Sequence, residues 1–148
     1  MKCKHLIVLF VCIFCFVIPS EAKVYLDVYG TSVKKVTIAV PHFKGQTVEK
    51  TDVAMNELLN KDLDTSGFFV VAPHTLFDRE LTDEGVEKGE IKFGNWRSLG
   101  VEILCKGKVQ GKNGDIIFEG YVYDTLDGSI VLAKRYTTKL VEWRKIIH

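Results

Sequence analysis

Hydrophobic and polar residues alternate along two stretches near the start of the chain. In Val24–Tyr29 the side chains of Val24, Leu26 and Val28 share one face, and Lys35–Val40 alternates in the same way. Gly30-Thr31-Ser32 separates the two stretches, and Pro41 ends the second because proline has no N–H to give to a ladder. A period of two predicts two strands here.

The next stretch changes to a helical period. After a polar loop over Lys44–Lys50, Thr51 or Asp52 is the expected N-cap of a helix of about four turns, and Gly67 suits its exit. Phe68–Ala72 is wholly apolar, which is typical of a strand covered on both faces. Strand, helix and strand in this order predict a right-handed crossover and a parallel pair. The buried stripe of the helix is expected to comprise Met55, Leu58, Leu59 and Leu63, with Val53 beside them.

The middle of the chain is less regular. Pro73–Phe77 has the length of one helical turn, and Asp78–Lys92 carries six acids and three bases, which predicts a hydrated, mobile segment. Asn95 is placed to cap a short helix over Trp96–Leu99.

The last third predicts an antiparallel meander. Asn113-Gly114 is a strong hairpin signal, Asp127-Gly128 turns the chain again, and Ser129–Thr138 returns as the final strand. Leu140–His148 then begins a helix with Trp143 on its apolar side. In the first strand of the meander, apolar positions alternate with charged ones: Val101, Ile103, Cys105 and Val109 against Glu102, Lys106 and Lys108.

The predicted fold class is therefore α/β, a mixed sheet with helices packed against it in the order β-β-α-β-(α)-β-β-β-α. The expected organisation is a leader over residues 1–22, a folded domain over 23–139, and over 140–148 the start of a helix that leads to a further domain. The abrupt end of that helix favours a fragment of a longer protein.

The first 22 residues have the pattern of a cleaved export signal. Lys2 and Lys4 precede an apolar run over Leu6–Val17, which is too short to span a bilayer, and Ser20-Glu21-Ala22 provides small residues before a cut between Ala22 and Lys23. The alternative is an uncleaved anchor. Cleavage predicts an exported product without stable membrane insertion.

Removal of the leader changes the charge and cysteine content. Two of the 20 Lys and Arg residues and one of the 19 Asp and Glu residues lie in it, so the remaining 126 residues carry no net charge. A neutral domain does not attract nucleic acid in general, although the layout is similar to that of anticodon-binding domains. Cys105 remains as the single cysteine, which excludes an intramolecular disulfide. Bulky residues precede Cys12 and Cys15, unlike the small residues of a lipoprotein signal.

Candidate chemistry is sparse. His42, His74 and His148 are far apart in the chain and lack metal-ligand spacing, so we expect no metal and no cofactor. The acidic pairs around Asp83-Glu84 lack the spacing of a calcium loop. Cys105 on the apolar side of a strand is expected to be an inert thiol. No acid, base and nucleophile converge, which predicts a protein that is not an enzyme.

Several segments together resemble one family. Val24–Val28 and Lys35–Phe43 look like the opening of the mature chain in the TolB family, and Asp62–Phe69 is similar to the DLxxSGxF helix exit of that family. Asn95–Glu102, with the following Gly107-Lys108-Val109, looks like the WRxLGAE…GKV segment of the family. Tyr123-Asp124 and Lys134-Arg135-Tyr136 resemble its FD…GKRY hairpin. The match covers nearly all of Lys23–His148. Val101 stands where the family often has Ala.

The resemblance implies a periplasmic part of the Tol–Pal envelope system of Gram-negative bacteria, which acts in envelope integrity and cell division. It implies that a TolA-like inner-membrane protein binds the mature N-terminal segment, here Lys23, Val24, Tyr25, Leu26, Asp27, Val28 and Tyr29. Pal binding is implied only where a propeller follows. The alternative is an exported regulator of peptidoglycan synthesis, or a secretion component, with a similar fold.

Mass spectrometry of the exported protein tests the leader. We expect a mature chain that begins with a free Lys23, because cleavage after Ala22 fits the small residues before it. A diacylated cysteine at the N-terminus would contradict this and favour the lipoprotein alternative.

Overall fold

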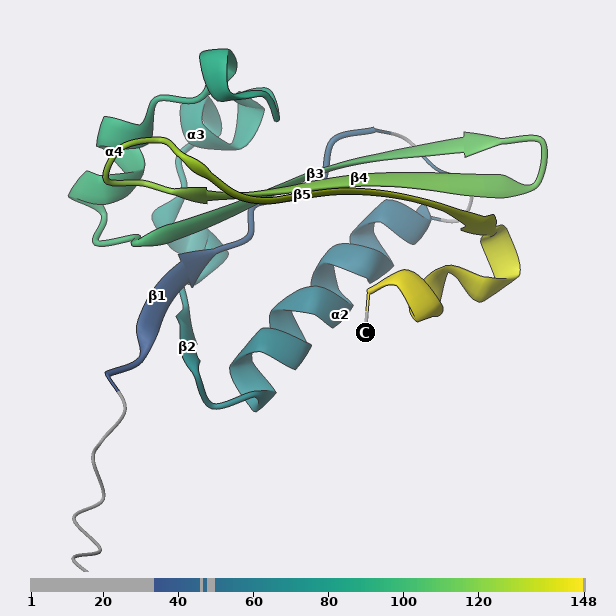
Figure 1. Ribbon diagram of the computed structural model, residues 1–148, viewed down its shortest axis with the longest axis horizontal. Coiled ribbons are helices and arrows are strands. Elements are labelled where there is room, and N and C mark those ends of the chain that lie inside the picture. The colour runs from purple at the N-terminus through teal and green to yellow at the C-terminus, as the bar shows by residue number, and fades with distance from the viewer. Residues whose placement is uncertain (1–33, 46, 48–49, 148) are drawn as a thin grey trace, which may run out of the picture. The chain divides into compact units, whose positions relative to one another are not determined.

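The computed structural model describes residues 34–45, 47 and 50–147. They form a five-stranded mixed sheet in the order β2-β1-β3-β4-β5, with helices on both faces (Figure 1). The predicted fold class is confirmed. The first predicted strand, Val24–Tyr29, lies outside the described residues.

The parallel part of the sheet follows the predicted strand–helix–strand order. β1 (Val36–Ala39) leads through α2 (Thr51–Thr65) to β2 (Phe69–Val71), and β1 and β2 pair in parallel. β2 is the edge strand, however, and Phe68 and Val70 are 63% and 50% exposed. The expectation that both faces of this strand are covered is wrong: Phe69 and Val71 pack against the core beneath α2, whereas Val70, on the other face, is exposed.

α2 keeps its apolar stripe but not its predicted cap. Lys50, at φ 54°, holds the N-cap position in place of Thr51 or Asp52. The Thr47 hydroxyl instead accepts a 2.9 Å hydrogen bond from the Asp52 amide and donates to the Asp52 carboxylate over 2.6 Å. Met55 is fully buried, whereas Val53 is 37% exposed and lies outside the stripe. Leu59 and Leu63 pack against the core.

The meander is present as predicted. β3 (Ile103–Lys112) pairs antiparallel with β4 (Asp115–Asp124), which pairs with β5 (Ile130–Lys139). Asn113 and Gly114 join β3 to β4 with φ of 51° and 81°. Two successive positive φ values are those of the tight hairpin turn that an Asn-Gly pair favours.

One face of the sheet packs against α2 and the C-terminal segment (Figure 1). Its core includes Phe43 and Phe118, whose ring centroids are 5.1 Å apart. Gly107 makes room for both rings, because a Cβ there would lie within 3 Å of each. The C-terminal segment is a 3₁₀ helix, η4 (Leu140–Ile146), and its Trp143 packs on this core.

Short helices cover part of the opposite face (Figure 1). The segment Asp78–Lys92, predicted to be mobile, is anchored here by the buried side chains of Leu81, Val86 and Ile91. Asn95 lies inside its helix rather than at the cap. The helices are η2 (His74–Leu76), α3 (Arg79–Asp83), η3 (Lys88–Glu90) and α4 (Phe93–Ser98).

A buried ion pair fastens that segment to the sheet. Lys106 of β3, expected on a polar face, is 2% exposed, and its ammonium lies 3.3 Å from the carboxylate of Glu84. Trp96 Nε1 donates to the same carboxylate over 2.7 Å, and the Lys92 amide donates to its other oxygen over 2.9 Å. The Lys106 ammonium also donates to the Leu81 carbonyl and lies 5.1 Å from the Trp96 ring centroid. Burial lowers the pKa of Lys106, and the carboxylate of Glu84 opposes that shift.

Removal of one partner of this pair is expected to destabilise the fold. Lys106→Met should lower the free energy of unfolding by about 3 kcal/mol, because it leaves a buried carboxylate without its cation. The double variant Lys106→Met/Glu84→Gln should recover part of that loss, since it removes the unpaired buried charge and the single amide oxygen of glutamine can still accept from Trp96. Urea unfolding measures both. Lys108→Met, two residues along β3, is the matched control, and a double variant no more stable than Lys106→Met would contradict the prediction.

Candidate functional site

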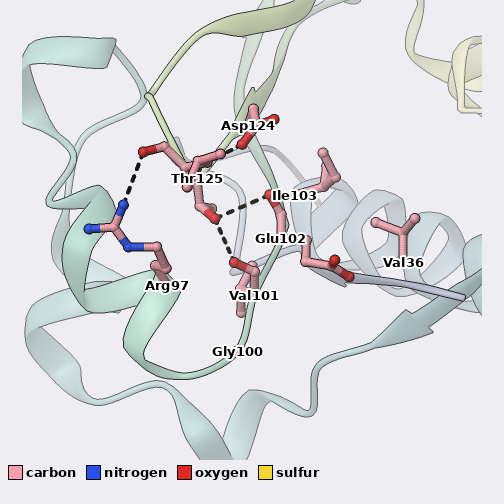
Figure 2. A pocket seen from close by; sticks show the side chains of 9 residues that line it. Val36, Arg97, Gly100, Val101, Glu102, Ile103, Asp124 and Thr125 are labelled. Carbon is pink, nitrogen blue, oxygen red and sulfur yellow. Dashed lines mark hydrogen bonds between the residues drawn. The ribbon is translucent and has the colours of Figure 1, made fainter. Parts of the chain in front are cut away.

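The predicted binding segment, Lys23–Tyr29, and the predicted cleavage point after Ala22 lie outside the described residues, which begin at Lys34. Close to Lys34, at the end of the sheet where β1 begins, lies a hollow of about 440 Å³ (Figure 2). Its lining residues are Val36, Arg97, Gly100, Val101, Glu102, Ile103, Asp124, Thr125 and Leu126.

Two chain reversals build the walls of this hollow. Gly100, at φ 78°, turns the chain from α4 toward β3. After β4, the hydroxyl of Thr125 donates to the Val101 carbonyl over 2.6 Å, and Arg97 Nη1 donates to the Leu126 carbonyl over 3.0 Å (Figure 2). These two hydrogen bonds connect the turn after β4 to the segment before β3. The residues that they join are 24 and 29 positions apart in the sequence.

Glu102 connects the hollow to the beginning of β1. Its carboxylate accepts a 3.0 Å hydrogen bond from the Thr37 amide and a 3.3 Å bond from the Lys34 ammonium, while its own amide donates to the Thr37 carbonyl. The amide of Thr37, followed by the ammonium of Lys34, holds the pKa of this carboxyl below its usual value. Glu102 is therefore the group through which the first described residue of the chain contacts the sheet.

The lining combines apolar side chains with polar groups that are already hydrogen-bonded. Of the apolar lining residues, Leu126 is 72% exposed and Val101 is fully buried. The hydroxyl of Thr125 and the guanidinium of Arg97 already bond to backbone carbonyls, and none of the nine lining residues is a histidine or cysteine. Such a surface offers apolar contact with a few oriented polar groups, which suits an extended segment of chain.

The structure brings together two histidines that are distant in the sequence. The rings of His42 and His74, which follow β1 and β2, stack with centroids 4.6 Å apart. Burial, and then the neighbouring His42, lower the pKa of His74. His148 lies outside the described residues. In the described part of the chain, no three His, Cys, Asp or Glu side chains are grouped to hold a metal ion.

Cys105 is buried among apolar side chains, as its position in the strand predicts. Burial raises its pKa to about 12, so the thiol stays protonated and is a poor nucleophile. Within the described ranges no helix has both the length and the apolar character required to cross a bilayer.

Pattern analysis of the sequence did not identify Arg97 and Glu102 as site residues. The available signal was the segment Asn95–Glu102, which with the helix exit is the most specific part of the family resemblance and supplies four of the nine lining residues. The turn residues Asp124 to Leu126 gave no comparable signal, because only the tertiary fold sets them beside that segment.

Comparison with protein families finds a match to the TolB amino-terminal domain over residues 24–131. The Tol-Pal system protein TolB of Geobacter sulfurreducens is 32% identical over 138 residues, which cover 89% of this chain and 30% of the relative. That of Syntrophus aciditrophicus is 26% identical over 141 residues, 92% of this chain and 31% of the relative. The chain thus spans about a third of the length of these curated relatives.

Solved structures show the same fold. TolB from Acinetobacter baumannii superposes with a TM-score of 0.62 at 16% identity, over 78% of this chain and 26% of that one. The LpoB C-terminal domain from Escherichia coli superposes with a TM-score of 0.54 at 13% identity, over 77% of this chain and 89% of that one.

The Glu102 contacts predict a stability that depends on pH. A carboxyl whose pKa is lower in the folded state stabilises the fold above its unfolded value of 4.5, and this contribution is lost as the pH falls through the folded value. Glu102→Gln should therefore lower the urea midpoint at neutral pH, and the difference from the natural chain should shrink below pH 4.5. Glu57→Gln, on the exposed side of α2, is the control. A difference that persists unchanged well into acid would contradict the assignment.

Proposed function

Because the chain belongs to the TolB amino-terminal domain family, we propose that it is a non-enzymatic adaptor domain of the Tol–Pal envelope system. In this proposal it works in the periplasm after removal of a cleaved signal, and its mature N-terminal segment, Lys23–Tyr29, binds a TolA-like inner-membrane protein. Pal is a partner only if a propeller follows in the complete protein.

The arrangement at the beginning of β1 supports a role for the segment that precedes it. β1 is paired on one side with β2 and on the other with β3, so neither of its edges remains for another strand. The alternating segment Val24–Tyr29 precedes Lys34 in the sequence and lies outside the described residues. An alternating extended segment is suited to add to the edge of a partner's sheet, where backbone hydrogen bonds supply affinity and alternate side chains supply specificity.

The chemistry of the described residues supports a binding role over an enzymatic one. The thiol of Cys105 is buried with a raised pKa, and the hollow beside β1 is lined by groups that already bond to backbone carbonyls. Ordering a segment on binding costs conformational entropy, so we expect weak to moderate affinity that is easily reversed.

Deletion of Lys23–Thr31 tests the proposal. The deleted chain should lose binding to a TolA domain in isothermal titration calorimetry, because the contacting residues are absent. Its urea midpoint should stay close to that of the natural chain, since Lys34 and Glu102 are kept.

Two point variants sharpen this experiment. Leu26→Asp should weaken binding because it places a charge on the apolar face of the segment, whereas Lys61→Glu on α2 should bind as the natural chain does. Unchanged affinity after the deletion would rule out this segment as the binding site.

A further inference from the structure

The outer edge of β5 is a second place at which a strand can add to this domain. β5 is the last strand of the sheet, and in the described part of the chain no strand pairs with its outer side. It is ten residues long, and nine of these residues are exposed. A long edge with unpaired N–H and C=O groups is a template for another strand.

The β5 edge carries exposed apolar side chains. Ile130, Val131, Leu132 and Tyr136 are 52%, 61%, 47% and 39% exposed. The ladder sets Leu132 opposite Val122 and Tyr136 opposite Phe118, both of which belong to the core that α2 covers. Leu132 and Tyr136 therefore extend the apolar face of the sheet to its open edge.

Among the basic residues of β5, Lys134 differs from Arg135 and Lys139 in having no acidic residue opposite it on β4. Arg135 and Lys139 reach across the ladder to β4 and pair with Glu119 and Asp115 at 3.3 Å and 2.6 Å. Lys134 lies opposite Gly120, which has no side chain to meet it. It stands on the same face as Leu132 and Tyr136 and midway between them. An added strand would thus meet one positive charge flanked on both sides by apolar side chains.

Like charges argue against a second copy as the occupant. Two β5 strands paired antiparallel over most of their length would bring either Lys134 or Arg135 opposite its own equivalent. Like charges directly opposite each other destabilise a strand pair. Charge complementarity favours a different partner, one with a carboxylate at this position.

We propose that the β5 edge binds an extended peptide that carries an acidic residue with an apolar residue two positions before it and two positions after it. The acid faces Lys134, and the apolar residues face Leu132 and Tyr136. The backbone of the peptide forms the sixth strand of the sheet. The residues of this surface, Ile130–Lys139, are not those of the proposed TolA-binding segment, so failure of this proposal would leave the proposed function standing.

The probe is a capped synthetic peptide, Thr-Leu-Thr-Glu-Thr-Leu-Thr, titrated to millimolar concentration into the ¹⁵N-labelled chain. Amide shifts in the NMR spectrum should concentrate on residues Ile130–Lys139. A second peptide with Lys in place of Glu should bind the natural chain at least about threefold more weakly, since an opposite-charge pair becomes a like-charge pair.

Reversal of the charge at residue 134 tests whether Lys134 determines the preference between the two peptides. Lys134→Glu should reverse the preference between the two peptides, whereas Lys61→Glu, which changes the net charge equally on α2, should keep that of the natural chain. The NMR spectrum of each variant reports directly whether it is folded. Absence of binding, equal affinity of the two peptides for the natural chain, or shifts centred away from β5 would each overturn the proposal.

Discussion

The burial of β3 on both faces is the constraint on which the rest of this structure depends. One face carries Cys105 and Val109 into the core beneath α2, and the other carries Leu104 and Lys106 beneath the short helices. A buried ammonium needs a counter-charge and hydrogen-bond partners, because isolated charge is costly away from water. Glu84 supplies the charge, and Trp96 and the Lys92 amide hold its carboxylate in place.

This requirement explains why a charged segment is ordered. Asp78–Lys92 has the composition of a solvated loop, yet it lies across the sheet because Glu84 must reach Lys106. Trp96, fixed by the same carboxylate, sets the position of α4, and Gly100, two residues after the end of α4, forms part of one wall of the hollow beside β1. The buried Lys106–Glu84 pair and the hollow beside β1 thus both follow from the position of β3.

The two edge strands of the sheet, β2 and β5, have different properties. At the β2 end the strand has only three residues, of which Val70 is exposed, and the exposed Phe68 precedes it. At the β5 end the strand is ten residues long, with two of its basic side chains already paired across the ladder. β1 lies between β2 and β3 in the sheet. Near the beginning of β1, the amide of Thr37 donates to the carboxylate of Glu102, which lines the hollow. The open edge of β5 is thus the longer and more exposed of the two edges of the sheet.

The sequence by itself determined the elements that depend on local chemistry. Asn113-Gly114 specifies its own turn, the stripe from Met55 to Leu63 specifies α2, and strand, helix and strand in succession specify a parallel pair. Only the tertiary structure decided that Lys106 is buried, that Glu84 meets it, and that His42 stacks on His74. These contacts join residues 22 to 32 positions apart, and no local pattern of polarity records which charged side chain a distant segment will cover.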